Sequence, residues 1–559
     1  MKIVIIGGVA GGATAAARLR RRDESAEIII FERSGYISYA NCGLPYYIGG
    51  IIEDKNDLTL QTPESFARRF RIDARILHEV TDIDVERKRV TVKDLQTGAI
   101  FEESYDKLIL SPGAKPIVPA YAEKENDAVF TLRTVEDTFR IHSYIEKTAP
   151  KTAVIIGGGF IGLEMAENLH RRSIRVTLIQ RSRQLLNILD PDMASFLHAK
   201  CRKEGIRILF ETNVTDIQGH TVYTDKTPPI EADMIVAAIG VSPENTLAKK
   251  AGLALGAKGA ITVNDRMQTS APDVYAVGDA VEITHFVTKE KAVITLAGPA
   301  NKEARIAADN ITGRDSRYKG SLGSSVIKMF DMTFAQTGLN EKAAKAAGID
   351  YEKVVLTPSS HAGYYPAATA MTMKILYEKK TLRLLGAQIA GYDGVDKRID
   401  VLATAIFSGL PADALQDLDL AYAPPYSSAK DPVNMAGFII DNIENGMMKQ
   451  FHYEDIEALR ARDDVTLLDT RTPAEYQRGH AEGFIHIPVD NLRERLHELD
   501  TKKPVYVMCQ SGLRSYIATR ILAQNGFDAY NFSGGYRFYQ SILSDAEAAK
   551  YTYPCGIEK

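Results

Sequence analysis

AVIIGGGFIG, residues 153–162, is the stretch that decides the fold of this chain. Its four leading apolar residues predict a buried parallel strand, and Gly157, Gly159 and Gly162 have the spacing of a tight turn that opens a helix. The N–H groups at a helix N-terminus favour negative charge, so this turn can hold the pyrophosphate of a dinucleotide. The stretch therefore predicts a nucleotide-binding α/β unit.

The strand predicted after this turn, residues 175–179, indicates which dinucleotide would bind. It ends in Gln180 and Arg181. A carboxylate here would accept the ribose hydroxyls of NADH, whereas a neutral Gln180 beside the cationic Arg181 can bind the 2′-phosphate of NADPH. Arg181 can also point into solvent, so the pattern favours NADPH and leaves NADH as the alternative.

The first residues of the chain carry an earlier copy of this pattern. The turn GGVAGG, residues 7–12, lies between an apolar run and a helix predicted over residues 10–22. Val9 replaces the middle glycine, so the turn alone also fits a simple tight connection. The next predicted strand, residues 28–31, ends at Glu32, whose carboxylate can accept ribose hydroxyls. A second dinucleotide site is therefore expected here.

Two more predicted strands end in sharp turns. Residues 107–110 lead into SPGA, residues 111–114, and residues 274–277 lead into Gly278 and Asp279. Such turns let the backbone approach a ligand closely. Asp279 can hydrogen-bond that ligand or cap the helix after it.

Along the chain these four features follow in the order 7–12, 111–114, 157–162 and 277–279. With this order, residues 1 to about 440 resemble the flavoprotein disulfide reductases that bind two dinucleotides. The resemblance implies an α/β fold with two Rossmann-like domains, one for FAD and one for NAD(P), followed by an α+β dimerisation domain. The implied bounds are residues 1–112 and 266–320 for the FAD domain, 113–265 for the NAD(P) domain and 321–445 for the dimerisation domain.

The resemblance also implies which residues contact the cofactors. Glu32 would bind the adenosine ribose of FAD, and Asp279 its ribityl chain. The residues implied for FAD are Gly7, Gly8, Gly11, Gly12, Glu32, Arg33, Ser111, Gly113, Asp279 and Ala297. The residues implied for NADPH or NADH are Gly157, Gly159, Gly162, Gln180 and Arg181. No metal site is implied.

Cys42 stands alone in the segment SYANCGLP, residues 38–45. A cysteine beside a nucleotide unit can be a redox centre if positive charge, a helix N-terminus or the cofactor stabilises its thiolate; otherwise it is a small core residue. Glutathione-type reductases carry a second cysteine where this chain has Tyr47. Without that resolving thiol, Cys42 would cycle through a mixed disulfide with substrate or through a sulfenic acid.

The segment around Cys42 is similar to the active-site segment of the coenzyme A-disulfide reductases, and AYAPPYSS, residues 421–428, is similar to their C-terminal motif. This likeness implies a homodimer in which Tyr364 and Tyr422 of one subunit reach the cysteine of the other and protonate the leaving thiolate. The alternative is that both tyrosines are core or interface aromatics. The residues implied for coenzyme A are Arg18, Arg21, Ser38 and Asn41. The two arginines can instead be solvated on their helix.

The chain continues beyond that motif. A strand predicted over residues 505–508 leads Cys509 into the loop CQSGLRS, residues 509–515, ahead of a helix. Converging amides and the helix N-terminus would stabilise a thiolate, and Arg514 would orient the loop or bind an anion. Residues 452–545 thus resemble a rhodanese sulfurtransferase domain of α/β fold. Tyrosine phosphatases use a similar loop with one more residue between cysteine and arginine, and the shorter loop here suits a persulfide better than a phosphate.

Composition excludes some partners. The 559 residues carry a formal net charge of −4, which gives no sign of a nucleic-acid or acidic-membrane partner. No apolar run is long enough to cross a bilayer, and four scattered cysteines fit a reducing compartment, so a cytoplasmic protein is expected. Cys201 is expected to be structural. Cys555 is expected to be a surface thiol, with a sulfur-relay role as the alternative.

Together these features predict one enzyme with two sulfur sites. NAD(P)H would reduce FAD, FAD would reduce a Cys42 disulfide, and Cys42 would reduce a coenzyme A disulfide, coenzyme A persulfide or polysulfide. Cys509 would carry sulfane sulfur as a persulfide, with the direction of transfer left open. One alternative is an NADH oxidase or peroxidase that uses a Cys42 sulfenic acid. The other is a sulfur-relay protein that delivers persulfide from Cys509 to a protein acceptor.

Overall fold

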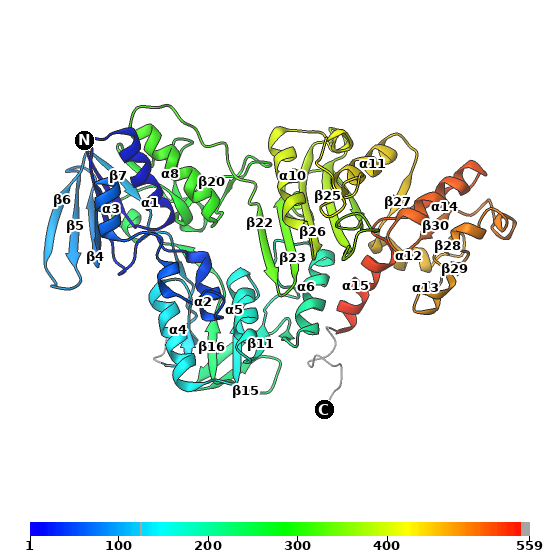
Figure 1. The fold of residues 1–559 in the computed structure, drawn as a ribbon, viewed down its shortest axis with the longest axis horizontal. Coiled ribbons are helices and arrows are strands. Elements are labelled where there is room, and N and C mark those ends of the chain that lie inside the picture. Colours follow the sequence, from blue (N-terminus) through cyan, green and yellow to red (C-terminus); the bar gives the residue numbers. More distant parts are fainter. Residues whose placement is uncertain (123–125, 549–559) are drawn as a thin grey trace. The chain divides into compact units, whose positions relative to one another are not determined.

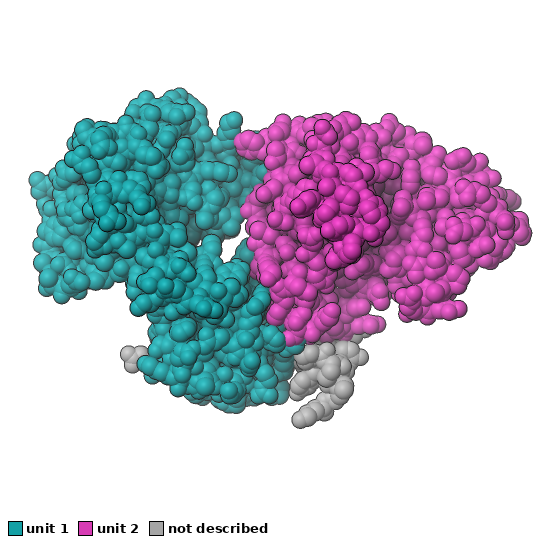
Figure 2. Space-filling model, in the orientation of Figure 1, with its two compact units in different colours: residues 1–183, 205–323 teal, residues 184–204, 324–559 magenta. Residues whose placement is uncertain are grey.

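The computed structural model describes residues 1–122 and 126–548. Two compact units are present: unit 1 contains residues 1–183 and 205–323, and unit 2 contains residues 184–204 and 324 onward (Figure 2). Within the described stretches, no helix is long and apolar enough to cross a bilayer.

The first predicted nucleotide unit forms a five-stranded parallel sheet in unit 1, with strand order β19-β7-β1-β2-β3 (Figure 1). Its strands are β1 (Lys2–Ile6), β2 (Glu27–Glu32), β3 (Asp73–Ile76), β7 (Lys107–Leu110) and β19 (Val274–Ala276). Helices α1 (Ala10–Arg22) and α8 (Ala297–Ile311) pack against each other. The central strands are buried and apolar, as expected of a parallel sheet covered on both faces. The predicted helix over residues 10–22 is confirmed.

AVIIGGGFIG lies in a second parallel sheet of unit 1, with strand order β12-β11-β10-β16-β9. Its strands are β9 (Val129–Phe130), β10 (Thr152–Ile156), β11 (Arg175–Ile179), β12 (Arg207–Leu209) and β16 (Met234–Ala237). Helix α5 (Phe160–Arg171) follows the glycine turn, and α4 (Val135–Thr148) precedes β10. The order strand, glycine turn, helix, strand is the same as in the first sheet, so the two predicted copies are confirmed as repeats of one unit.

Smaller elements complete unit 1. One three-stranded sheet contains β4 (His78–Asp84), β5 (Arg89–Asp94) and β6 (Ile100–Ser104). A second contains β13 (Val214–Gln218), β14 (Thr221–Thr224) and β15 (Ile230–Glu231). A third contains β18 (Ile261–Thr262), β20 (Val281–Thr284) and β21 (Lys291–Ala292). Strands β8 (Ala114–Pro116) and β17 (Val241–Pro243) form a pair. Short helices are α2 (Leu44–Ile48), α3 (Pro63–Phe70) and α7 (Thr246–Lys250).

Unit 2 contains an antiparallel five-stranded sheet with order β22-β23-β26-β25-β24. Its strands are β22 (Ser325–Met329), β23 (Met332–Gly338), β24 (Tyr351–Leu356), β25 (Met371–Glu378) and β26 (Leu384–Gly391). Its helices are α9 (Glu341–Ala346), α10 (Val395–Ser408) and α11 (Pro432–Glu444). Helix α10 packs on β23 and β26.

Helix α6 (Pro191–Lys203) belongs to unit 2, although its residues lie inside the range expected for the NAD(P) domain. It packs against β22 and β26 and buries Met193, Leu197 and Cys201. Cys201 is therefore a core residue of unit 2, as its expected structural role requires.

The C-terminal part of unit 2 contains a parallel five-stranded sheet with order β27-β31-β30-β28-β29. Its strands are β27 (Lys449–Phe451), β28 (Thr466–Asp469), β29 (Ile485–His486), β30 (Val505–Met508) and β31 (Ala529–Phe532). Its helices are α12 (Ile456–Arg460), α13 (Pro473–Gln477), α14 (Leu513–Gln524) and α15 (Gly535–Ala548). The predicted strand over residues 505–508 is confirmed, and Cys509 follows it directly.

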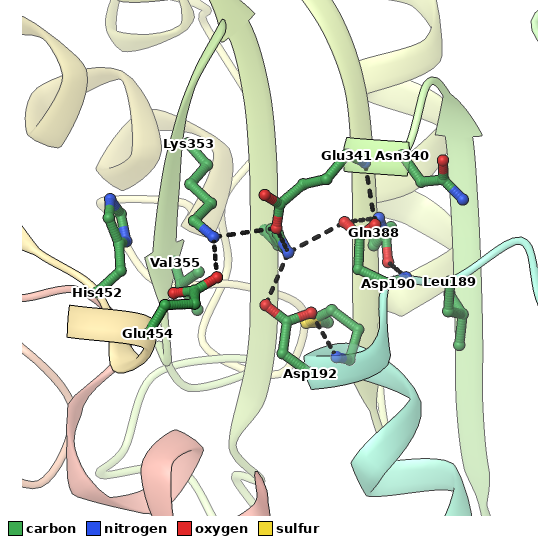
Figure 3. Close-up of polar contacts among 12 residues, drawn as sticks. Leu189, Asp190, Asp192, Asn340, Glu341, Lys353, Val355, Gln388, His452 and Glu454 are labelled. Carbon is green, nitrogen blue, oxygen red and sulfur yellow. Dashed lines mark hydrogen bonds and ion pairs between the residues drawn. The ribbon is translucent and has the colours of Figure 1, made fainter. Parts of the chain in front are cut away.

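A buried charge network ties α6 to the antiparallel sheet of unit 2 (Figure 3). Lys374 on β25 is fully buried, and its Nζ lies 3.0 Å from Asp190 and 2.7 Å from Asp192, at the start of α6. It also pairs with Glu341 on α9. A buried ammonium without partners would be very costly, so these carboxylates account for the attachment of α6 to this sheet.

The network continues to the C-terminal sheet through β24. The Lys353 ammonium lies 3.0 Å from Glu341 and 2.6 Å from Glu454, which precedes α12 (Figure 3). Close by, the Val355 N–H donates to the Ser533 hydroxyl at 2.9 Å, beyond the end of β31. Strand β24 therefore joins the two sheets of unit 2 by both charged and neutral hydrogen bonds.

Candidate active sites

The first glycine turn admits only glycine at two places. Gly7 has a φ of +95°, and a Cβ there would lie 2.1 Å from the carbonyl oxygen of Ser111. A Cβ on Gly12 would lie 1.8 Å from the carbonyl oxygen of Gly7. No side chain fits at such distances, so the turn brings the N-terminus of α1 close to the strand ends. This is the arrangement that a phosphate site needs.

Glu32 joins this turn from the end of β2. Its Oε2 accepts a hydrogen bond from the Gly8 N–H at 2.8 Å, and its Oε1 accepts one from the Ser34 N–H at 2.9 Å. Burial raises the pKa of Glu32, although both N–H donors act against that shift. A buried carboxylate beside a glycine turn suits a ribose ligand, so these residues fit FAD. Arg33, by contrast, is exposed.

The other residues predicted for FAD lie at the same edge of the first sheet. Ser111 and Gly113 follow β7, Asp279 follows the neighbouring strand β19, and Ala297 begins α8. A Cβ on Gly11 would come within 2.6 Å of the Ser111 hydroxyl, so this turn also meets α1. Parallel strands bring these residues together although they are far apart in sequence.

Two charged residues at this edge were not predicted. Arg133 lies 2.6 Å from the Asp279 carboxylate, and the buried Glu303 accepts the Gly278 N–H at 2.7 Å. Burial raises the pKa of Glu303 to about 7. Neither residue lies in a motif of the sequence, and only the fold brings them to Asp279.

The second glycine turn has the same construction. Gly157 has a φ of +108°, with a Cβ position 2.3 Å from the Ala238 carbonyl oxygen, and a Cβ on Gly162 would lie 1.9 Å from the Gly157 carbonyl oxygen. At Gly159 no atom lies within 4 Å of a Cβ position. The open space at this glycine is where a pyrophosphate would pass, so the turn fits NAD(P)H.

Gln180 takes the place that Glu32 has in the first unit. Its Oε1 accepts the Gly158 N–H at 3.0 Å, and its amide nitrogen donates to the Ser182 hydroxyl at 2.7 Å. The neutral amide therefore closes the turn without adding negative charge. Arg181 is exposed at the end of β11, where it is free to turn toward a bound nucleotide.

Cys42 is exposed in a short turn, residues 41–43, directly before α2. Local burial raises the pKa of its thiol, and the negative charges of Glu164 and Asp279 raise it further, while Arg133 lowers it. The chain alone therefore disfavours the thiolate at neutral pH. If Cys42 is a redox centre, a bound cofactor must stabilise its thiolate.

Glu164 is the carboxyl group that raises the pKa of Cys42 most, and it was also not predicted as a site residue. It lies on α5, two residues after the motif glycine Gly162, and burial raises its pKa to about 7. The Tyr46 hydroxyl lies 3.5 Å from its Oε1. Its place directly after the glycine motif is a sequence signal that could have identified it.

The residues predicted for coenzyme A divide into two groups. Arg18 pairs with Asp309 on α8 at 2.7 Å and is therefore held by the fold, whereas Arg21 is exposed. Ser38 and Asn41 lie near Cys42 in sequence and are half-buried. Of the two arginines, Arg21 is therefore the more accessible to an anionic ligand.

Tyr364 and Tyr422 meet in unit 2. Their hydroxyl oxygens are 2.7 Å apart, and both side chains are exposed, to 76% and 45%. The hydrogen bond to Tyr364 raises the pKa of Tyr422. Large exposed aromatics in contact through their hydroxyls are more typical of a site or an interface than of a core.

Cys509 lies in a loop whose donors converge on its sulfur. The Gly512 N–H donates to Sγ at 3.1 Å, and the Ser515 hydroxyl donates to it at 3.2 Å. The start of α15 lies against the loop, since the Tyr536 N–H donates to the Cys509 carbonyl oxygen at 2.7 Å. These donors stabilise negative charge on the sulfur, as expected of a thiolate or persulfide cradle.

Two arginines hold this loop. Arg514 makes a bidentate ion pair with Glu475, with distances of 2.7 and 2.8 Å, and this hydrogen bonding lowers the pKa of Glu475 to about 2. Arg471, which was not predicted, is buried, pairs with Asp469 and donates to the Gln510 side chain at 3.3 Å. Arg514 therefore ties the loop to Glu475, and Arg471 ties it to Asp469 through the Gln510 side chain.

Within the described residues, no three His, Cys, Asp or Glu side chains cluster so as to hold a metal ion. The third thiol considered above, Cys555, lies outside the described residues.

Three family models match the chain. Residues 1–304 match pyridine nucleotide-disulphide oxidoreductase, residues 324–432 match its dimerisation domain, and residues 452–541 match the rhodanese-like domain. The three matches follow the same order as the sheets described above.

Several known proteins are similar to this chain. Coenzyme A disulfide reductase of Staphylococcus epidermidis is 39% identical over 438 residues, covering 78% of this chain and 99% of that protein. The crystal structure of reduced CoADR-RHD from Bacillus anthracis has a TM-score of 0.95 and 48% identity, covering 97% of this chain and 98% of that one. A NAD-dependent persulfide reductase from A. fulgidus has a TM-score of 0.90 and 37% identity, covering 96% of this chain and 100% of that one.

Proposed function

The chain belongs to the pyridine nucleotide-disulphide oxidoreductase family, and on this premise we propose that it reduces coenzyme A disulfide or coenzyme A persulfide with NAD(P)H. Two relatives support the substrate class, since one is a coenzyme A disulfide reductase and the other a persulfide reductase. FAD would occupy the first glycine turn and NAD(P)H the second, in a cytoplasmic homodimer. The domain bounds expected from the sequence form part of this proposal.

The observation that carries the proposal is the isolation of Cys42. Among the residues that the structure describes, it is the only cysteine of unit 1, because Cys201 and Cys509 belong to unit 2. Tyr47 stands where a resolving cysteine would be, and its ring lies 5.8 Å from that of Phe139, centroid to centroid. With no second thiol in its unit, Cys42 needs the sulfur of a substrate to form a disulfide.

The reaction begins with attack of the Cys42 thiolate on one sulfur of coenzyme A disulfide. The substrate S–S bond breaks, a disulfide forms between Cys42 and coenzyme A, and the other coenzyme A leaves as a thiolate. The partner subunit's Tyr364 and Tyr422 would give this thiolate a proton. When bound, FAD supplies the two electrons of NAD(P)H that reduce the mixed disulfide and release the second coenzyme A.

Cys509 gives the chain a second sulfur chemistry. Its thiolate would attack the outer sulfur of a persulfide or similar donor, so that the donor thiolate leaves and Cys509 holds the sulfane sulfur. The Gly512 N–H and the Ser515 hydroxyl, which already donate to Sγ, would stabilise the charge of this persulfide. A coenzyme A thiolate can then take the sulfur and become a substrate for Cys42.

The proposal is tested by measuring NAD(P)H turnover with one electron acceptor at a time. NAD(P)H consumption would be measured anaerobically with coenzyme A disulfide or coenzyme A persulfide, and separately with oxygen or peroxide. We expect coenzyme A acceptors to be preferred, Cys42→Ser to abolish their reduction, and Cys509→Ser to leave reduction of the disulfide unchanged. Cys509→Ser should abolish only sulfur transfer from a donor such as thiosulfate.

Two results would count against this function. Full turnover of coenzyme A disulfide by Cys42→Ser would remove Cys42 from the reaction. A preference for oxygen or peroxide would favour the oxidase or peroxidase alternative, in which an exposed lone cysteine forms a sulfenic acid.

A further inference from the structure

Two loops of unit 2 carry the tyrosine pair. The first, residues 359–367, follows β24 and contains Tyr364; the second, residues 418–431, precedes α11 and contains Tyr422. The two hydroxyl groups are 2.7 Å apart, although 58 residues separate them in sequence. Exposed side chains do not keep such a distance by themselves, so the loops below them must be fixed to each other.

Arg398 lies beneath both loops. It belongs to α10 and is 1% exposed. Its Nη2 donates to the carbonyl oxygen of Ser360 in the first loop at 3.0 Å, and to the carbonyl oxygen of Tyr426 and the hydroxyl of Ser427 in the second loop at 3.2 and 3.1 Å. One guanidinium group therefore bonds to the backbone of both loops.

Asp431 is the counter-ion of Arg398 and anchors the second loop. Its Oδ2 lies 3.0 Å from Nη2 of Arg398 and accepts the Ser427 hydroxyl at 2.6 Å. It also caps α11 by accepting the Val433 N–H at 3.0 Å. Burial acts to raise the pKa of Asp431, but these hydrogen bonds outweigh burial and lower it, so the carboxylate stays charged.

The backbone around Arg398 is shaped to receive it. A Cβ on Gly394, which has a φ of +67°, would lie 2.0 Å from Nη1, so only glycine leaves room for the guanidinium group there. The loops also touch directly, since the Ala362 N–H donates to the Ser427 carbonyl oxygen at 3.0 Å. A glycine, a buried ion pair and a helix cap therefore all lie beneath the tyrosine pair.

Stability alone does not require this arrangement. A buried ion pair often adds little to stability compared with well-packed apolar side chains of similar volume. What a guanidinium group adds is geometry, because its planar fork can hold several acceptors in fixed directions at once. Here those acceptors belong to the two loops that must bring Tyr364 and Tyr422 together.

We propose that Arg398 and Asp431 are positioning residues that hold the two loops in register, so that Tyr364 and Tyr422 act as one hydrogen-bonded proton donor. This inference rests on the proposed role of the tyrosines in protonating the leaving coenzyme A thiolate. Losing Arg398 or Asp431 leaves both phenols in the chain but lets their hydroxyl groups separate. A misplacement of about 1 Å can cost on the order of 10²-fold in rate.

The test is a double-mutant cycle on disulfide turnover by the full-length flavoprotein. Arg398→Met and Asp431→Asn are measured in the wild-type chain and again in a Tyr364→Phe/Tyr422→Phe background. Lys397→Met is the matched control: its Nζ lies 3.8 Å from Asp431, beyond hydrogen-bond distance, so the substitution removes a charge beside Asp431 without removing a hydrogen bond to either loop. Ser427→Ala, which deletes only one hydroxyl group, is the milder variant if Arg398→Met fails to fold.

We expect Arg398→Met to lower kcat for coenzyme A disulfide about tenfold or more, with KM for NAD(P)H and the rate of flavin reduction unchanged. Ser427→Ala should lower kcat by a smaller factor, and Lys397→Met should leave it unchanged. In the background without both phenols, Arg398→Met should cause no further loss, because it acts through them.

Two results would overturn the inference. One is unchanged turnover in a folded Arg398→Met or Ser427→Ala dimer. The other is an equal loss with and without the two phenols, which would mean that Arg398 acts elsewhere. If the double Phe variant itself turned over coenzyme A disulfide at the wild-type rate, the proposed role of the tyrosines would fail instead, so the two failures are distinguishable.

Discussion

At the scale of single residues, Cys42 shows how much of this chemistry depends on its surroundings. Burial, Glu164 and Asp279 all raise the pKa of its thiol, and Arg133 alone among the charges that act on it opposes them. Cys42 therefore needs stabilisation from a bound ligand to react as a thiolate.

Glu164→Gln should make Cys42 more reactive, but only above about pH 7. The pKa of Glu164 is about 7, so below this pH its carboxyl group is already neutral and the substitution changes little. Above it, removing the negative charge lowers the pKa of Cys42, and alkylation by iodoacetamide should accelerate roughly two- to fivefold. Peptide mapping of the alkylated protein across pH 6–9 measures this. Equal rates for both proteins at pH 8.5 would contradict the prediction.

At the scale of elements, the two strand–turn–helix units are built by the same contacts. Gly7 and Gly157 both need positive φ, and Gly12 and Gly162 both lie against the carbonyl oxygen of the first glycine. Gly159 is different, because its Cβ position is open. This contrast separates glycines that the fold requires from one whose Cβ position is open.

Gly162→Ala and Gly159→Ala form a matched pair for this contrast. A methyl group at residue 162 collides with the Gly157 carbonyl oxygen at 1.9 Å, so Gly162→Ala should destabilise unit 1 by about 3 kcal/mol or more. Gly159→Ala should keep the wild-type melting temperature and raise KM for NAD(P)H, because its methyl group occupies the space of the pyrophosphate. Thermal unfolding and steady-state kinetics measure both. A destabilised Gly159→Ala variant would contradict this assignment.

Arg181→Ser should change nucleotide preference at the end of β11. If Arg181 binds the 2′-phosphate, its loss removes a charge-assisted hydrogen bond and weakens NADPH about tenfold, with little effect on NADH. The ratio of kcat/KM for the two nucleotides measures the change. An unchanged ratio would mean that Arg181 points into solvent.

The sequence predicted those parts of the sites whose signal is local. The glycine turns, their strands, Glu32, Gln180 and the Cys509 loop all follow each other within short segments, and the structure places them as expected. Arg133 and Glu303 could not be predicted, because each reaches Asp279 only through the packing of strands and helices far apart in sequence. Arg398 was missed for the same reason.

At the scale of the whole molecule, unit 2 joins two sheets and a helix through buried charge. Lys374 and Lys353 face four carboxylates, those of Asp190, Asp192, Glu341 and Glu454 (Figure 3). Lys374 binds the carboxylates at the start of α6, Lys353 binds Glu454 ahead of α12, and Glu341 pairs with both lysines. The stability of unit 2 should accordingly depend on the ionisation of these carboxylates.

Unit 2 should lose stability in acid as Glu341 takes up a proton. Burial alone would raise the pKa of Glu341, but Lys374 and Lys353 outweigh it and hold the pKa at about 2. Its contribution, roughly 3 kcal/mol, is therefore present above the unfolded-state pKa and is lost between about pH 4.5 and pH 2. Glu341→Gln should be less stable than wild type at pH 7 and equally stable near pH 2. Urea unfolding at several pH values measures this, and a pH-independent difference would contradict it.

The most direct measurement of the central claim is the mass of the protein after exposure to coenzyme A disulfide without NAD(P)H. We expect one coenzyme A per chain, joined by a disulfide to Cys42, absent from Cys42→Ser and released when NAD(P)H is added. An unmodified Cys42, an oxygen adduct in place of coenzyme A, or an adduct that NAD(P)H does not release would contradict it.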